Sequence, residues 1–296
     1  MSPLVLLVVC FVVGIALQRV PSLPRDMPRA LNAFIIWVCL PALVLLHVPR
    51  LDVTWSLALP IATPWLICLV AIPVFAALGR LFGWSRGTVG ALVLTGGLGN
   101  TSFVGLPMIE AFHGPEAMGL GLLIDQFGSF IALSFIGMPV AAIAAGGNPD
   151  LRAIMRRIVL FPPFVALVLA FVIRGTVPLP GVALEVLERI GGALAPLALV
   201  SVGMQLRLGA VRERAGRLGA GLLYKLILAP AMVIAVLALA PGLDDTVRAV
   251  TVLEAAMAPM ITGSIIAAEH RLDPELAALM VGVGIPLSFL TVFLFV

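Results

Sequence analysis

The run GGLGNTSFVGLP, residues 96–107, interrupts an apolar segment with four glycines, an amide, two hydroxyl side chains and a proline. In the hydrocarbon region of a membrane an unpaired backbone polar group costs several kcal/mol. A helix is therefore broken there only where the freed groups are buried in protein or line a cavity. Transporters with discontinuous helices place their binding sites at such breaks. We interpret this run as the functional centre of the chain; the alternative is a kinked, continuous helix that packs closely through its glycines.

The composition places this run in a membrane. The chain has 296 residues, of which 61% are apolar and only 11% charged, and its mean hydropathy is +1.18. Soluble domains carry about 25% charged residues, so the composition predicts an integral membrane protein. The apolar segments recur along the whole chain, which indicates one polytopic domain. The three cysteines fall within these segments and predict neither disulfides nor a metal cluster.

Ten segments are long and apolar enough to span a membrane, which takes about 20 residues in a helix. They predict an all-α membrane protein. The ten segments are 3–20, 31–48, 57–79, 88–111, 117–145, 158–175, 182–206, 217–240, 246–268 and 275–296. The first segment has no positive residue before it and no cleavage pattern after it, so we expect it to be retained as a span.

The arginines give the orientation, because cytoplasmic loops are enriched in Lys and Arg. With both termini outside, thirteen arginines lie in cytoplasmic loops and four in outer loops. The cytoplasmic set is Arg19, Arg25, Arg29, Arg80, Arg86, Arg152, Arg156, Arg157, Arg207, Arg212, Arg214, Arg217 and Arg271, and the outer set is Arg50, Arg174, Arg189 and Arg248. With one span more or fewer, the arginine-rich loops would no longer lie on the same side of the membrane, so the distribution of arginines supports ten spans.

The chain also shows a weak internal repeat. A Gly-rich loop at 146–150 divides it near the midpoint, and we expect a first repeat at 1–145, a cytoplasmic connecting loop at 146–157 and a second repeat at 158–296. LPALV at 40–44 and APLAL at 195–199 occupy equivalent spans, and spans 4 and 9 carry the breaks at a similar offset. Five spans per half is an odd number, so the second half is inverted, and an inverted repeat predicts a binding site at the interface of the halves.

Polar side chains at the span 4 break suit an anion. Asn100, Thr101 and Ser102 offer an amide and two hydroxyls, which donate hydrogen bonds without placing a full charge in the bilayer. The N-terminal end of a half-helix adds partial positive charge. The alternative is that these side chains only join neighbouring helices by hydrogen bonds.

Span 9 supplies the counterpart, EAAMAPMITGS at 254–264. Pro259 removes a backbone donor and clashes with the preceding turn, and Thr262 and Gly263 follow where a second half-helix would begin. An ordinary proline kink is the alternative. The residues predicted to surround the substrate are Asn100, Thr101, Ser102, Gly105, Pro107, Pro259, Met260, Thr262 and Gly263.

Three further polar residues are candidates for coupling transport to an ion. Asp125 and Gln126 lie in the first turns of span 5, and Glu254 lies inside span 9. Ionisable groups at membrane depth are functional candidates, here for holding a coupling proton or Na⁺; the alternative is that each is interfacial and hydrated. The only lysine, Lys225, lies near the start of span 8 beside Tyr224, and we expect it to extend to the cytoplasmic interface.

The sequence does not support other classes of protein. The three histidines lie in separate loops without metal-ligand spacing, and no nucleotide-binding loop, nucleophile elbow or HExxH motif is present. The basic loops are too short to read nucleic acid. The expected partners are a small organic anion and the lipid bilayer, with no cofactor beyond a coupling proton or Na⁺.

The motifs resemble those of a known family. NTSFVGLPMI at 100–109, followed by AFHG at 111–114, resembles span 4 of the auxin efflux carrier family, which includes the plant PIN-formed proteins and bacterial carriers of malonate and malate. Residues 255–274 resemble span 9 of that family, and residues 31–42 and 196–203 fit its spans 2 and 7.

The resemblance implies two inverted five-helix repeats, with helices 4 and 9 broken and crossing at the membrane midplane. It also implies a homodimer in which spans 1, 2, 6 and 7 form a scaffold and the other six spans move, and it implies that Asn100 binds the substrate carboxylate. Two features depart from the family. Pro259 comes one residue later than usual, and the loop between the halves has about twelve residues, which resembles the short prokaryotic type of the bacterial cytoplasmic membrane.

These observations predict a secondary transporter that moves a small mono- or dicarboxylate, such as malonate, malate or an auxin-like acid, by alternating access. The alternative is a sodium-coupled symporter of larger amphipathic anions. Glu254 resembles the sodium-ligating glutamate of the bile acid sodium symporters, although the asparagine that accompanies it there is Pro259 here. A membrane sensor would need an output surface, which loops this short do not offer. An enzyme would need a nucleophile and base pair, and none is evident.

Overall fold

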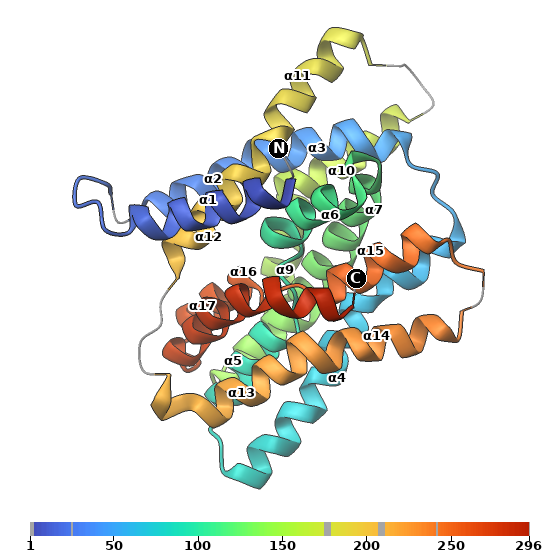
Figure 1. Cartoon of the computed structure of the whole chain (residues 1–296). Coiled ribbons are helices and arrows are strands. Elements are labelled where there is room, and N and C mark those ends of the chain that lie inside the picture. The colour runs from blue at the N-terminus through green and yellow to red at the C-terminus, as the bar shows by residue number, and fades with distance from the viewer. Residues whose placement is uncertain (1–2, 25, 175–178, 207–210, 241, 296) are drawn as a thin grey trace.

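A computed structural model describes residues 3–24, 26–174, 179–206, 211–240 and 242–295. Within these residues the chain is mainly helical and forms no β-strand (Figure 1). Two arginines used above for the orientation, Arg25 and Arg207, lie outside the described residues. An all-helical architecture satisfies the backbone groups of an apolar chain internally, as a bilayer requires.

The helices follow the apolar segments closely. They are α1 (Pro3–Leu17), α2 (Met27–Phe34), α3 (Leu40–His47), α4 (Ala58–Phe82), α5 (Arg86–Gly96), α6 (Leu106–His113), α7 (Met118–Leu123), α8 (Met138–Ala144), α9 (Leu151–Val159), α10 (Pro162–Ile173), α11 (Gly181–Gly192), α12 (Leu194–Gln205), α13 (Ala215–Leu223), α14 (Ala229–Ala238), α15 (Asp245–Ala255), α16 (Ile261–Glu269) and α17 (Pro274–Thr291). Several are joined end to end by π-helical turns, at Ile35–Cys39, Ile124–Phe130, Leu133–Gly137 and Tyr224–Leu228, and a further π-helical turn, Thr101–Gly105, leads into α6. Such turns occur frequently at functional sites.

Six continuous helical segments of the described chain are long and apolar enough to cross a membrane. They are Met27–Arg50, Trp55–Phe82, Pro115–Ala144, Gly181–Gln205, Arg212–Ala238 and Pro274–Leu294. Helices α9 and α10 form a seventh candidate, bent by 58° at their junction. The other predicted spans coincide with the short apolar helix α1 and with the broken segments α5–α6 and α15–α16. The chain is therefore a multi-pass membrane protein, and most of α9 lies in the segment predicted as a connecting loop.

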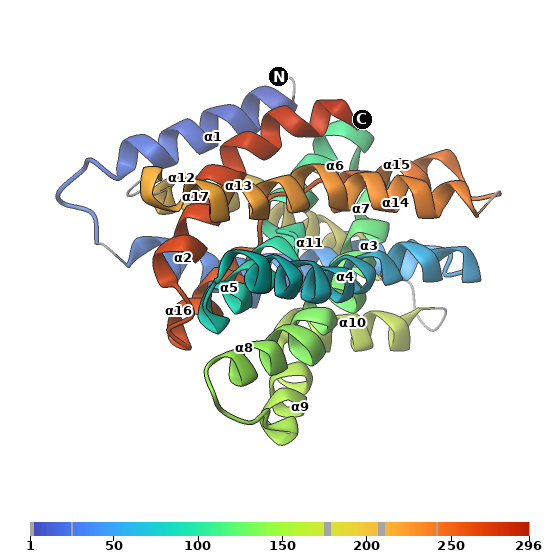
Figure 2. The ribbon, with the colours of Figure 1, turned by 90° about the horizontal axis from the view of Figure 1, so that it is seen from below.

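The helices form two groups. Helices α1, α2 and α12 pack together, as do α3, α10 and α11, and these helices occupy the upper part of Figure 1. Helix α5 packs against α4, α16 and α17, and α14 packs against α15, in the lower part of the same view. Viewed at a right angle, α8 and α9 protrude together from one side (Figure 2).

The outer faces of several helices are apolar and exposed. On α1 these residues are Val5, Val8, Val9, Val12 and Val13, and on α10 they are Val165, Val168, Leu169 and Val172. Contiguous apolar surfaces of this kind are rare on soluble monomers and mark an interaction surface. Together with the apolar helices, they fit contact with lipid.

One close contact between the broken helices gives a stability prediction. A Cβ atom on Gly263 in α16 would collide with the backbone carbonyl oxygen of Leu94 in α5. Because backbone cannot move aside cheaply, we expect Gly263→Ala to lower the free energy of unfolding by about 1–3 kcal/mol. The matched control is Gly219→Ala in α13, where a Cβ meets open space. Thermal unfolding in detergent measures both, and equal melting temperatures for the two variants would contradict this packing.

Candidate functional site

The two broken segments meet at their breaks. Helix α5 ends at Gly96 and the chain becomes helical again at Thr101, while α15 ends at Ala255 and α16 begins at Ile261. Gly99 and Pro259 face each other in an isolated antiparallel bridge. The Asn100 N–H donates to the Ala258 carbonyl at 2.8 Å, and the Met260 N–H donates to the Leu98 carbonyl at 3.1 Å. The backbone groups that each break frees therefore pair with those of the other break, and neither segment is a kinked, continuous helix.

The break in the first segment is shorter than the prediction, which extended it to Pro107. It covers residues 97–100, because Pro107 lies in the first turn of α6. A proline is tolerated in the first turn of a helix, since its missing N–H has no intrahelical partner there. Pro107 is consequently buried helix structure and lines neither of the cavities described below.

Asn100 is the residue at which the second half-helix begins. Its Oδ1 accepts a hydrogen bond from the Phe103 N–H at 3.2 Å, which makes it the N-cap of the π-helical turn Thr101–Gly105. The side chain is 2% exposed, and its Nδ2 has no partner within the described structure. The site therefore contains a buried amide donor whose hydrogen bond is unmade.

Asp125 accepts the hydrogen bonds that we expected Thr101 and Ser102 to offer to a substrate. Both hydroxyls donate to Asp125 Oδ1, each at 2.5 Å, and Gln126 Nε2 donates to Asp125 Oδ2 at 2.6 Å. Asp125 is only 2% exposed. A buried carboxylate requires such donors, since burying it unpaired is costly. In this conformation the hydroxyls of Thr101 and Ser102 therefore bind a carboxylate of the protein itself, that of Asp125.

Lys225 lies at the crossing and not at the membrane interface, so the prediction made for it from the sequence was wrong. Its side chain is fully buried, and Nζ donates to the Ala255 carbonyl at 2.6 Å. Ala255 is the last residue of α15, and the C-terminal end of a helix carries partial negative charge. The π-helical turn Tyr224–Leu228 places the lysine within the protein, where the ammonium group meets this end.

Glu254 lies next to this lysine and interacts with it electrostatically. Its side chain is 2% exposed, and both carboxyl oxygens lack a hydrogen-bond partner among the described residues. A Cβ atom on Gly105 would collide with Glu254 Oε2, so the glycine predicted for the substrate site makes room for this carboxyl group. Gly105 thus acts on Glu254 through packing.

Two cavities adjoin these residues. The smaller has a volume of about 10 Å³ and is lined by Thr101, Ser129, Lys225 and Glu254, among others. A polar cavity of this size holds roughly one water molecule. Ser129 Oγ is buried and without a partner in the described part of the chain, which leaves a further polar atom free at this cavity.

The larger cavity, which we call the chamber, has a volume of about 100 Å³. Its lining includes Ser102, Asp125, Met260 and Thr262 from the broken segments and span 5, together with Ile36, Leu40, Arg157 and Phe161. It therefore lies between the two helix groups, with α9 contributing Arg157. Ser102 and Thr262 belong to the first turns of the two second half-helices.

A wider pocket, the vestibule, adjoins the chamber. Its volume is about 750 Å³, and its lining includes Arg29, Asn32, Gln205 and Ser264. Ile36 lines both cavities and so lies between them. Ligand pockets for drug-sized molecules usually measure about 300–1,000 Å³, so the vestibule falls in this range while the chamber is narrower.

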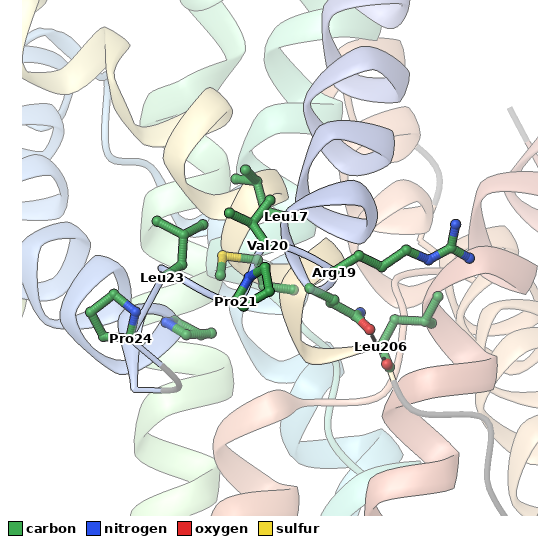
Figure 3. Close-up of a pocket in the computed structure, with 10 residues that line it drawn as sticks. Leu17, Arg19, Val20, Pro21, Leu23, Pro24 and Leu206 are labelled. Atoms are coloured by element: carbon green, nitrogen blue, oxygen red, sulfur yellow. Dashed lines mark hydrogen bonds between the residues drawn. The ribbon is translucent and has the colours of Figure 1, made fainter.

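A further pocket, of about 440 Å³, lies where α1 ends beside α12 (Figure 3). Its lining is mainly Leu, Val and Pro side chains, and the Arg19 side chain extends away from them. The Gln18 amide is already engaged, donating to the Gly203 carbonyl at 2.7 Å. Because no group of polar side chains converges there, this pocket is a weaker candidate than the chamber.

The predicted site residues thus fall into three sets. The chamber contains Ser102, Asp125, Met260 and Thr262, and the small cavity contains Thr101 and Glu254. The remaining residues line neither of these two cavities: Asn100, Gln126 and Pro259 are buried around the crossing, Gly105 packs against Glu254, Pro107 lies in α6, and Gly263 packs against α5.

Sequence reasoning missed three residues of the site: Lys225, Ser129 and Arg157. A signal existed for two of them. Lys225 is the only lysine of the chain, and Arg157 lies between the apolar Ile154 and Ile158 on one face of an amphipathic helix.

Comparison with known proteins gives matches to membrane transporters. Residues 150–296 match the family model described as membrane transport protein. An uncharacterised transporter of Methanothermobacter thermautotrophicus is 27% identical over 279 residues, which cover 91% of this chain and 88% of the relative. An uncharacterised transporter of Methanocaldococcus jannaschii is 26% identical over 215 residues, or 70% of this chain and 68% of the relative. The second half of the chain therefore matches the membrane transport protein family, in agreement with the resemblance to the auxin efflux carriers.

Proposed function

We propose that this protein is a secondary transporter that moves a small organic anion across the cytoplasmic membrane by alternating access. The observation that carries the proposal is the position of the chamber. It is lined by first-turn residues of both second half-helices, Ser102 and Thr262, and it lies between two groups of helices. Helix N-termini favour anions, and a site between two packed bodies can open to either side when they move.

The architecture proposed for this transport is an inverted repeat of residues 1–145 and 158–296 with ten spans and both termini outside. The antiparallel bridge between Gly99 and Pro259 supports it, because it joins equivalent breaks of the two halves. In this orientation the vestibule, which includes Arg29, opens to the cytoplasm. Assembly as a homodimer follows from the resemblance to the auxin efflux carriers.

We propose that transport is independent of sodium. In sodium-coupled transporters with broken helices, the C-terminal ends of half-helices and freed carbonyls coordinate the ion. Here the ammonium group of Lys225 occupies such an end by donating to the Ala255 carbonyl. A coupling proton would then be held by Glu254 or Asp125. Thr101 lines the small cavity, Ser102 lines the chamber, and both donate to Asp125, so Asp125 links the two cavities.

The test is counterflow in proteoliposomes that contain the purified protein. Labelled malonate, malate, succinate and indole-3-acetate are each offered against the same unlabelled acid, in Na⁺ and in K⁺ buffers of equal ionic strength. We expect exchange of at least one acid at the same rate in both buffers. Binding of an acid without exchange would contradict the transporter and support a membrane sensor instead.

The sodium-coupled symporter is the second candidate, because both carboxyl oxygens of Glu254, next to the small cavity, have no hydrogen-bond partner among the residues that the structure describes. Exchange that requires Na⁺ in the wild type and loses this requirement in Glu254→Gln would establish it in place of the sodium-independent carrier.

Glu254→Gln gives the prediction for proton coupling. The amide keeps the size of the side chain but cannot bind and release a proton at neutral pH. We expect the variant to retain exchange at equal substrate concentrations and to lose accumulation driven by an imposed pH gradient. The matched control is Glu110→Gln, since Glu110 lies in α6 and lines neither cavity. Undiminished gradient-driven accumulation in Glu254→Gln would assign the coupling to another group.

A further inference from the structure

Arg157 is a cation on the wall of the chamber that the proposed function does not yet use. Helix α9 packs through Ile154 and Ile158 against Phe130 of the π-helical turn Ile124–Phe130. Arg157 lies on this packed face, is half-buried and lines the chamber. Its neighbour Arg156 is exposed. The position of α9 alongside α8 is visible in Figure 2.

Within the described part of the chain, the guanidinium group of Arg157 has no carboxylate partner. No acidic oxygen of the described residues lies within 4.0 Å of it, and Glu269 acts on it only from farther away. Its Nη1 donates to the thioether sulfur of Met138, at 3.5 Å. A partly buried cation without a partner is unfavourable, and such groups in membrane proteins mark pathways for ligands.

The acid that also lines the chamber, Asp125, already has its hydrogen bonds made. Asp125 accepts from Thr101 and Ser102 at one oxygen and from Gln126 at the other. The hydrogen-bond donors around Asp125 are therefore already engaged. A second carboxylate that enters the chamber needs hydrogen-bond donors from other residues. Arginine meets this need, because its planar fork of N–H groups matches a carboxylate in a bidentate pair.

Much of the remaining lining of the chamber is apolar and aromatic. It includes Leu40, Phe103, Phe130, Leu133 and Phe161. The rings of Phe130 and Phe161 are stacked, with their centroids 4.0 Å apart and their planes inclined by 15°. A ligand whose carboxylate meets Arg157 would thus lay its less polar part on these side chains. The low polarity also strengthens the charge pair.

We propose that Arg157 binds the carboxylate of the transported anion and is the residue that selects acids over neutral analogues. This assignment rests on the proposed function, because it presumes that the anion passes through the chamber. It adds a residue from the linker between the halves to a site otherwise built from the crossing.

The test replaces and then restores the positive charge at this position. Arg157→Cys and the control Arg156→Cys are compared in counterflow before and after treatment with a cationic methanethiosulfonate and with an anionic one. The three native cysteines are buried and therefore protected. We expect the KM of Arg157→Cys to rise at least about tenfold, as the loss of a charge-assisted hydrogen bond predicts. The cationic reagent should restore most of the affinity, the anionic reagent should not, and Arg156→Cys should behave as the wild type throughout.

The outcomes separate this inference from the proposed function. Wild-type exchange with an unchanged KM in Arg157→Cys would overturn the assignment of Arg157 and leave the transporter intact. Equal effects of the two reagents would overturn it as well, because the charge would then be irrelevant. Each comparison uses one folded variant before and after modification, so misfolding cannot imitate the result. No exchange of any acid by the wild type would instead overturn the proposed function.

Discussion

Replacing Lys225 by methionine is expected to lower the free energy of unfolding by about 3 kcal/mol and to abolish transport. Methionine approximates the length of the lysine side chain but carries no charge and no donor. The substitution leaves the Ala255 carbonyl unpaired at the end of α15 and leaves the buried Glu254 without its nearby cation. Chemical unfolding in detergent measures the stability, and counterflow in proteoliposomes measures the transport.

The double variant Lys225→Met, Glu254→Gln is the control for the electrostatic explanation. Removing the carboxylate removes the uncompensated charge, so we expect it to recover much of the stability lost in the single variant. Interaction energies of residues that share a site reach about 0.5–3 kcal/mol in such cycles. A double variant no more stable than Lys225→Met would show that the lysine matters only as a donor to Ala255.

Sodium supplies a second readout on the same variant. If the ammonium group occupies the place of a coupling cation, its removal opens that place beside Glu254 and the Ala255 carbonyl. We expect Na⁺, compared with choline at equal ionic strength, to raise the melting temperature of Lys225→Met and not that of the wild type. An identical response of both proteins would count against the proposed sodium independence.

The crossing was predictable from sequence because its cause is local. Glycines and a proline inside otherwise apolar runs weaken a helix wherever they occur, and both breaks fall within the runs identified at 96–107 and 254–264. The end of the first break was misplaced because a proline such as Pro107 is compatible with two structures. It breaks a helix when it lies in the interior, but it is tolerated in the first turn of a new helix, where it lies here. Only the position of Asn100 as N-cap distinguishes them.

The partners within the site were not predictable, since they depend on which distant segments meet. Sequence identifies Thr101 and Ser102 as donors, but nothing local shows that Asp125, in the next span, accepts from both. The same holds for Lys225. A lysine near the end of an apolar segment usually reaches the membrane surface, and it is the π-helical turn and the end of α15 that make an interior position favourable here.

Substitution of Asn100 is the other change with a large expected effect on transport, because the two polar atoms of its side chain have separate roles. Oδ1 caps the half-helix by accepting from the Phe103 N–H, while Nδ2 is buried and has no partner in the described structure. Serine retains an acceptor that suits an N-cap but lacks the amide donor, and alanine lacks both. We therefore expect Asn100→Ser to unfold like the wild type and Asn100→Ala to lose about 1 kcal/mol of stability.

The effects of the two variants on transport should differ from their effects on stability. If Nδ2 donates to the anion as it passes the crossing, both variants lose a charge-assisted hydrogen bond of about 1.5–3 kcal/mol, and the kcat/KM of exchange falls roughly 10- to 100-fold in each. Counterflow of the acid with the highest wild-type rate measures this fall. Wild-type kinetics in Asn100→Ser together with impaired Asn100→Ala would reduce Asn100 to a cap and leave anion binding to the helix termini and the chamber wall. A loss of transport in both variants, with stability lost only in alanine, would instead place the anion at the crossing itself.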